Sequence, residues 1–473
     1  MVSFRSAAPL VLLLLSSCVS GPNHTPPQID LPQKFNEGGS GSAGDVTAKA
    51  WWPAFNDRRL DAYVEQGLSQ NLTVLQAIER ITAAEANVIS AGAGSLPQLA
   101  ADASETLSGQ GGELRTQTST LSSASGGLSA SWLLDLFGQY RRAKEGALAS
   151  LDSAYATADV ARLTYLSNVV NAYIDVRYYQ ERLAIARKNL TSRRETLDLT
   201  KLQLEAGAAS RLDVVQSEGL VNSTLADIPG FDKGFRISAH NLATLLGLPA
   251  ETLIAELQKG GRQPVARFST KAGVPADLIR NRPDIRAAER DLAAAVAQIG
   301  VAEADFYPSI TLGGSISPTL RNMSGTNGWL TTWSFGPTLN LPIFTGGALK
   351  ANLTTAESNA RNAYLAWKET VLGAVQDVAD ALASIKRDAE TVTALRRTVQ
   401  SYEEALRLST ASYRDGASSL LDVLDAQRSV STAQASLATA VQQLASDYVA
   451  LNVAMGGGYA ATGPVRVATT TKP

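Results

Sequence analysis

The sequence predicts a mostly helical protein with a small β part, built as two similar halves that each contain long helices and one pair of strands. Three observations lead to this fold class. No proline occurs between Pro97 and Pro229 or between Pro342 and Pro464, and both stretches are rich in Ala, Leu, Arg, Gln and Glu, which favour helix. Short segments in each half alternate apolar and polar side chains, as strands do. Finally, motifs recur at an offset of 207 to 211 residues, which indicates a duplication.

The amino terminus has the pattern of a secretory signal. Arg5 precedes a short apolar run, 9–15, and two serines separate that run from the only cysteine, Cys18. The run is far shorter than the roughly 20 residues that a spanning helix needs. It resembles a bacterial lipoprotein signal, which implies that Cys18 becomes the acylated first residue and that Val19 directs the protein to the outer membrane. The alternative is an ordinary secretion signal that holds an incidental cysteine.

The duplication sets the expected organisation of the chain. Phe137 recurs as Phe344, and a five-residue motif recurs 209 residues later. The motif comprises Gly207, Ser210, Leu212, Asp213 and Val214, and its second copy comprises Gly416, Ser419, Leu421, Asp422 and Val423. We expect a signal peptide over 1–17, a flexible acylated tether over 18–50, a first repeat over 51–260, a second repeat over 261–456 and a tail over 457–473. The tether is expected because that segment is rich in Pro, Gly, Ser and Asn.

Each repeat is expected to contain a helix of about 35 residues, a strand hairpin, a helix of about 70 residues, a glycine turn and a return helix of about 37 residues. At about 1.5 Å per residue, the long helix reaches roughly 100 Å, and the two shorter helices laid end to end cover the same distance. Apolar side chains in the second long helix step by three and four residues, which is coiled-coil spacing. They are Val375, Val378, Leu382, Ile385, Ala389 and Val392, followed after one slip by Leu395, Val399, Tyr402 and Leu406.

Two strand hairpins are expected, over 98–136 and 309–344, with strands of about nine residues joined by glycine-rich stretches at 109–127 and 322–328. Four strands cannot close a barrel, whereas strands in a bilayer must close so that no backbone group is left unpaired. We therefore expect several copies of the chain to share one membrane barrel. A soluble hairpin cap is the alternative.

Several motifs together resemble those of the TolC-like outer membrane efflux proteins, in the lipoprotein branch that serves resistance-nodulation-division (RND) pumps. They are Cys18, the duplicated halves, the Arg-Pro-Asp-Ile sequence at 282–285 and the stretch YRDGASSLLDVLDAQ at 413–427. The resemblance implies a homotrimer with a shared 12-strand outer-membrane β-barrel and a trimeric α-barrel tunnel in the periplasm. It also implies passive conduction of cargo, with a periplasmic adaptor protein, an inner-membrane RND-type pump and outer-membrane lipid as partners.

Candidate site residues cluster at the glycine turns. Gly207 and Gly416 are expected to end the long helices with positive φ, so that the chain can reverse. By resemblance these turns form the periplasmic tip, which makes Gly207, Arg414 and Gly416 candidate adaptor contacts. By the same resemblance, Asp422 and Asp425 match the aspartate rings that narrow a closed tunnel.

The two aspartates differ in how well local structure explains them. Asp422 follows Ser419 at capping-box spacing, so a helix cap is a sufficient explanation for it. Asp425 corresponds to Gln216 in the first half, so capping does not account for it. In a trimer, these positions would place six carboxylates around one axis, where mutual repulsion raises some pKa values and attracts cations.

Composition excludes several other classes. Asp plus Glu number 44 against 42 for Lys plus Arg, so no basic surplus favours nucleic acid. One cysteine and two histidines are too few for a His/Cys metal cage, and no cofactor is expected. No phosphate-binding glycine loop, zinc-protease motif or nucleophile elbow occurs, so we do not expect an enzyme. A coiled-coil lipoprotein that acts as a spacer or adhesin remains the alternative, although it leaves the strand hairpins unexplained.

Overall fold

The computed structural model describes residues 19–32, 34–37, 46–114, 121–266, 277–278, 281–323 and 326–461. The described chain forms two compact units, and each unit draws on both sequence halves. The first unit comprises residues 1–28, 80–154 and 287–368, and the second comprises 29–79, 155–286 and 369–473. Cys18, the predicted acylation site, lies outside the described residues.

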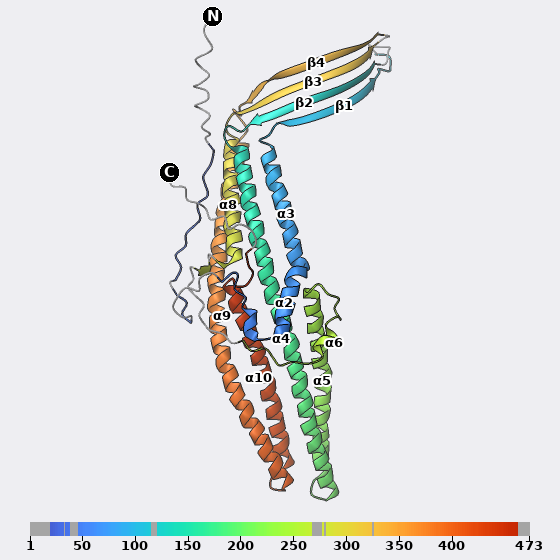
Figure 1. Cartoon of the computed structure of the whole chain (residues 1–473), viewed down its shortest axis with the longest axis vertical. Helices are drawn as coiled ribbons and strands as arrows, with labels where there is room; N and C mark the ends of the chain where they lie inside the picture. Colours follow the sequence, from blue (N-terminus) through green and yellow to red (C-terminus); the bar gives the residue numbers. More distant parts are fainter. Residues whose placement is uncertain are drawn as a thin grey trace. The chain divides into compact units, whose positions relative to one another are not determined.

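The helices repeat with the period of the sequence. In the first half, α4 (Gln139–Glu205) contains 67 residues and α5 (Arg211–Leu245) contains 35. In the second half, α9 (Ala348–Arg414) and α10 (Leu420–Ala454) have the same two lengths. Each pair of corresponding helices begins 209 residues apart, which is the offset of the glycine-turn motif (Figure 1).

The leading helix of the first half is broken, although a single helix of about 35 residues was predicted. The helix α2 (Arg58–Gln70) ends before Asn71, and α3 (Leu72–Ala93) begins after it. The side chain of Asn71 accepts hydrogen bonds from the amides of Thr73 and Val74 and donates one to the carbonyl of Leu245. Asn71 therefore caps a new helix instead of continuing the old one.

Shorter elements complete the helical part. In the second half, α8 (Pro283–Ala304) has 22 residues, the same number as α3. Two further short helices in the described chain are η1 (Trp52–Phe55) and α6 (Ile254–Leu257). Trp51 is buried beside η1 and donates a hydrogen bond from its indole Nε1 to the carbonyl of Gly457. None of the helices in the described ranges combines the length and apolarity needed to cross a bilayer.

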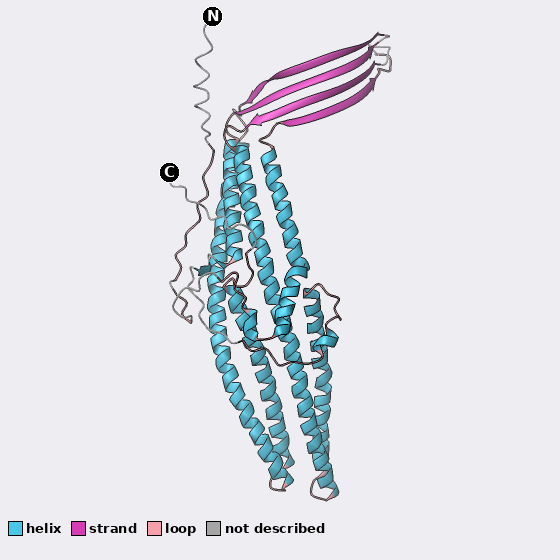
Figure 2. Cartoon of the chain, viewed as in Figure 1, coloured by secondary structure: helices cyan, strands magenta, loops and turns pink. Residues whose placement is uncertain are grey.

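The two hairpins form one antiparallel sheet in the order β1-β2-β3-β4 (Figure 2). The strands are β1 (Gln98–Ser108), β2 (Leu121–Leu134), β3 (Ser309–Met323) and β4 (Thr326–Asn340). Their lengths are 11, 14, 15 and 15 residues, so the expected nine was too short. The error arose because 121–127 and Gly328 were assigned from the sequence to the connections between strands. In the structure these residues pair with neighbouring strands.

Pairing between β2 and β3 joins the hairpins, from Leu134 opposite Ile310 to Ser122 opposite Asn322. The ladder is interrupted where β2 passes Pro318, which has no amide to donate. The register continues unchanged beyond this gap, so side chains keep alternating between the two faces of the sheet along the whole length of β2 and β3.

Candidate functional site

The chain reverses at the end of each long helix through the same backbone turn. Gly207 has φ +73° and Gly416 has φ +74°, a conformation that favours glycine. The amide of Gly207 donates to the carbonyl of Leu204, and the amide of Ala208 donates to the carbonyl of Gln203. This pair of bonds is a Schellman motif, which satisfies carbonyls at the helix end. Both glycines are exposed, and no described atom lies within 4 Å of a Cβ placed on either.

The return helices begin with matching caps. The amide and the hydroxyl of Ser210 both donate to Asp213 Oδ2, at 2.8 and 2.7 Å. The same two groups of Ser419 donate to Asp422 Oδ2, at 3.0 and 2.8 Å. Asp422 therefore caps α10 as its sequence context predicted, and its carboxylate also faces the favourable end of the helix dipole.

Asp425 lies one helical turn further along α10 and has no capping contact in the described chain. Its Oδ1 is 3.1 Å from Arg428 Nη1, and both side chains are more than half exposed, so the pair contributes little to stability. Arg414, the last residue of α9, is also exposed. It borders a cavity of about 590 Å³ that is also lined by Lys188, Glu403 and Arg407.

The two helical hairpins contact each other close to their turns. Buried Tyr413 and Val423, near the second turn, belong to a cluster against which Leu199 and Leu220 pack. Polar bonds cross the same contact. Tyr413 Oη donates to Thr200 Oγ1, the Gln203 side chain donates to the Tyr413 carbonyl, and Gln427 Nε2 donates to Thr196 Oγ1 at 2.8 Å. Tyr413 and Gln427 are the first and last residues of the predicted glycine-turn stretch, yet no sequence pattern indicated that they join the two halves.

The sheet has two chemically different faces. Its register places Leu128 opposite Ile316, and Ile316 opposite Trp333, so one face carries apolar side chains across three strands. The large residues on that face of β4 are exposed, and they comprise Trp329, Trp333, Phe335 and Leu339. The other face carries hydroxyls: Ser104 is 2.9 Å from Ser125, and Ser315 is 3.0 Å from Ser334. Such an exposed apolar face matches what a bilayer requires of a strand.

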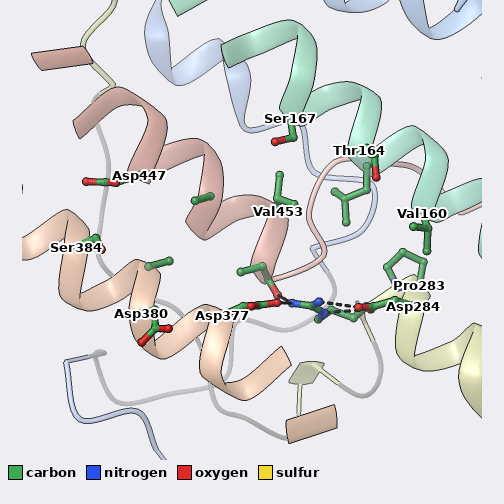
Figure 3. A pocket seen from close by; sticks show the side chains of 15 residues that line it. Val160, Thr164, Ser167, Pro283, Asp284, Asp377, Asp380, Ser384, Asp447 and Val453 are labelled. Carbon is green, nitrogen blue, oxygen red and sulfur yellow. Dashed lines mark hydrogen bonds and ion pairs between the residues drawn. The ribbon is translucent and has the colours of Figure 1, made fainter. Parts of the chain in front are cut away.

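A cavity of about 550 Å³ lies beside the start of α8 (Figure 3). Arg282 binds Asp284 through two nitrogens and reaches Asp377 at 2.9 Å and the Ala454 carbonyl at 3.1 Å. Pro283 takes the first helical position, and Asp284 lies in the first turn. The Arg-Pro-Asp motif therefore fixes the start of α8 and ties it to α9 and α10.

The same cavity is bordered by Asp447 of α10, whose side chain is only 5% exposed. The pKa of Asp447 is raised to about 6, mainly by burial and also by the neighbouring Asp388 carboxyl, while a hydrogen bond from Gln443 opposes the rise. Neither residue was singled out from the sequence, because each is an ordinary polar residue of a helix until the fold brings α9 and α10 together.

Comparison with known proteins agrees with these features. The family model described as outer membrane efflux protein matches residues 63–248 and 274–457. Nodulation protein T of Rhizobium leguminosarum bv. viciae is 59% identical over 461 residues, which cover 98% of this chain and 95% of the relative. Outer membrane protein OprJ of Pseudomonas aeruginosa is 32% identical over 462 residues, which cover 97% and 96%. The solved structure of the outer-membrane channel OprN matches with a TM-score of 0.84 and 31% identity, over 93% of this chain and 100% of that chain.

Long paired helices joined to a two-faced sheet define a TolC-like outer-membrane channel. The chain belongs to the outer membrane efflux protein family. Its function is that of an efflux channel in the outer membrane, with its helices forming a periplasmic tunnel. The fold class and function predicted from the sequence are thus confirmed, and the spacer or adhesin alternative is not favoured. The family consists of channel proteins rather than enzymes.

Proposed function

We propose that three copies of this chain form one passive duct that receives cargo from a periplasmic adaptor and an RND-type pump in the inner membrane. The main support is the sheet. Within the described residues, β1 and β4 each pair on one side only, and an open edge in lipid leaves amides and carbonyls unpaired. Neighbouring copies would pair β4 of one chain with β1 of the next. Members of this family form trimeric channels that work with adaptors and pumps.

We place the constriction of the duct at Asp422 and Asp425. Both carboxylates are exposed on α10 just after the second turn, and three copies would bring six of them around one axis. Arg428 pairs with Asp425, so it would moderate the negative field of that ring. We expect the lining to attract cations without selecting among cargoes, because the pump performs that selection.

The adaptor contact is assigned to the two turns, through Gly207, Arg414 and Gly416. The support is geometric, because both glycines are exposed with open space around them and Arg414 offers an exposed cation beside a cavity. Cys18 is assigned as the acylated residue that anchors the chain to outer-membrane lipid. On this view, residues 1–17 are removed and the two repeats, 51–260 and 261–456, contribute equivalent parts to the duct.

The experiment is to purify the chain from membranes in mild detergent and to test it in planar bilayers. We expect a trimer that dissociates on heating in detergent and that conducts ions when reconstituted. A monodisperse monomer without conductance would overturn the shared-duct proposal. Mass spectrometry of the mature amino-terminal peptide tests acylation separately, since an unmodified Cys18 contradicts the anchor and leaves the duct standing.

A further inference from the structure

Residues Val19–His24, which directly follow the predicted acylated cysteine, contact several parts of the first compact unit. The contacts are with the connection between β2 and α4, with the first turn of α4 and with α8. The amide of Ser20 donates to the carbonyl of Phe137 at 3.0 Å. A flexible tether was expected over 18–50, but these residues of it are held by specific contacts.

Arg142 in the first turn of α4 provides most of these contacts. Its Nε donates to the carbonyl of Ser20, and its Nη2 donates to the carbonyl of Gly21 and to Asn23 Oδ1, each at 2.9 Å. Its Nη1 donates to Glu145 Oε2 at 2.7 Å. The side chain is 3% exposed, and a buried guanidinium is costly unless its donors are satisfied. Three of its four hydrogen bonds go to the amino-terminal segment.

Glycines allow the segment to approach this closely. A Cβ on Gly300 of α8 would lie 2.7 Å from the Ser20 carbonyl oxygen and 2.8 Å from Arg142 Cγ. Gly21 has φ +82°, and a Cβ there would lie 2.4 Å from Gly300 Cα. Any side chain at Gly300 would therefore push the segment or Arg142 out of place. Glycine at these two positions therefore permits the observed approach of the segment to α8.

A hydrogen bond between two side chains holds the far end of the segment. His24 Nε2 lies 2.6 Å from Glu289 Oε1, and both side chains are largely buried. Burial opposes ionisation of Glu289, but hydrogen bonds from His24 and Arg290 outweigh burial and lower its pKa. The carboxylate is thus held ionised as a partner for His24.

We propose that Arg142, Gly300 and Glu289 form a receptor for the chain's own amino terminus, which holds the acyl-bearing residue beside the base of the sheet. This inference rests on the acylation of Cys18 proposed above. Consecutive Cα atoms are about 3.8 Å apart, so a group attached to the residue before Val19 would start within one residue of the held segment. Because the sheet belongs to the membrane and the helices to the periplasm, the acyl chains would enter the inner leaflet next to the strands that they help to position.

The test uses a nitroxide label at Thr25→Cys, an exposed position next to the pinned segment. Acylation consumes the Cys18 thiol, so the label reacts at one place. We expect a slow-motion spectrum in the parent trimer in proteoliposomes and at least a several-fold shorter rotational correlation time in Arg142→Ala and in Gly300→Ala. Arg142→Lys should give an intermediate correlation time, because one ammonium group cannot reach all of the oxygens that Arg142 binds.

Two neighbouring variants are matched controls. Arg141→Ala removes the adjacent cation, which contacts Asp135 instead of the segment. Gly146→Ala adds a methyl group to α4 at ordinary contact distance, 3.5 Å from Ala294 and Ala297. Both variants should leave the rotational correlation time of the label as long as in the parent. A mobile label in the parent, or a label unaffected by Arg142→Ala, overturns the receptor. If a variant fails to assemble, the spectrum of the labelled parent trimer decides by itself whether the segment is held.

A second arm tests the consequence for the anchor. Ten Gly/Ser residues inserted between Val19 and Ser20 would keep acylation but lengthen the chain between the acylated residue and the held segment. The same insertion after Gly44 would keep acylation and leave that distance unchanged. We expect the first insertion to slow the appearance of heat-modifiable trimer by several-fold and the second to leave it unchanged. Equal rates contradict the positioning role. Mass spectrometry of Cys18 separates this result from a failure of acylation itself.

Discussion

The two aspartates of α10 differ in their local contacts, because Asp422 caps the helix and Asp425 does not, and substitutions can separate their proposed roles. Asp425→Asn removes one carboxylate per chain and leaves the Ser419–Asp422 cap intact. We expect altered conductance and weaker block by multivalent cations, because three fewer charges would face the axis of the proposed trimer. Asp422→Ala should have the same effect and also loosen α10. Asp213→Ala is the matched control, since it removes only the equivalent cap. Unchanged cation block in Asp425→Asn would contradict the constriction.

The buried carboxyl of Asp447 gives the channel a definite pH dependence. Its pKa is raised to about 6 from an ordinary value of 3.8, so between these values the folded state holds a proton that the unfolded chain has released. This group therefore lowers stability as pH rises from about 4 to 6, and the loss persists above pH 6. Asp447→Asn should be more stable than the parent at pH 7.5, by up to about 3 kcal/mol, and equal to it below pH 4.

Denaturant unfolding of the detergent-solubilised protein across this pH range measures the effect. Asp388→Asn should give a smaller shift of the same sign, because Asp388 adds to the raised pKa. A stability difference between Asp447→Asn and the parent that is independent of pH would show that packing, and not ionisation, is responsible.

Among the elements, the helices were predicted better than the strands, for a physical reason. Helix length depends on local propensity and on the 3.6-residue period, so α4 and α9, each with 67 residues, were expected at about 70. The break at Asn71 was missed although part of its cause is local, since Asn71 caps the amides of Thr73 and Val74, while its bond to Leu245 is distant in sequence. The glycine-rich segment at 121–127 was missed because pairing with distant residues, in β1 and in β3, makes it a strand.

The candidate site shows the same division between local and distant causes. The positive φ of Gly416 and the cap at Asp422 follow from a few adjacent residues, and both were expected. The contacts of Tyr413 and Gln427 with α4 depend on residues more than 200 positions away, and the contacts of Arg142 with Ser20 span 122 positions. No local pattern marks either set.

The turn after α9 offers a direct test of an element. Gly416→Ala forces a side chain into φ +74°, which we expect to destabilise the hairpin by about 1 kcal/mol or more. Gly373→Ala, in the middle of α9 with open space around it, should instead stabilise the helix by up to about 1 kcal/mol. Urea midpoints of the two variants should therefore move in opposite directions. Equal shifts would show that the turn does not depend on the left-handed glycine.

For the whole molecule, the decisive property is that the two faces of the sheet meet different surroundings. Trp333 is 77% exposed on the apolar face, and the next residue, Ser334, lies on the hydroxyl-bearing face opposite Ser315. Trp333→Arg should sharply reduce the membrane-inserted, heat-modifiable trimer, because a cation facing lipid costs about 2–4 kcal/mol per copy at mid-bilayer. Ser334→Arg adds the same charge one residue away and should assemble normally, with altered conductance instead. Quantifying trimer in outer-membrane fractions distinguishes the two. If both variants assemble equally well, the apolar face of the sheet does not face lipid, and the proposal that several copies share one membrane barrel loses its support.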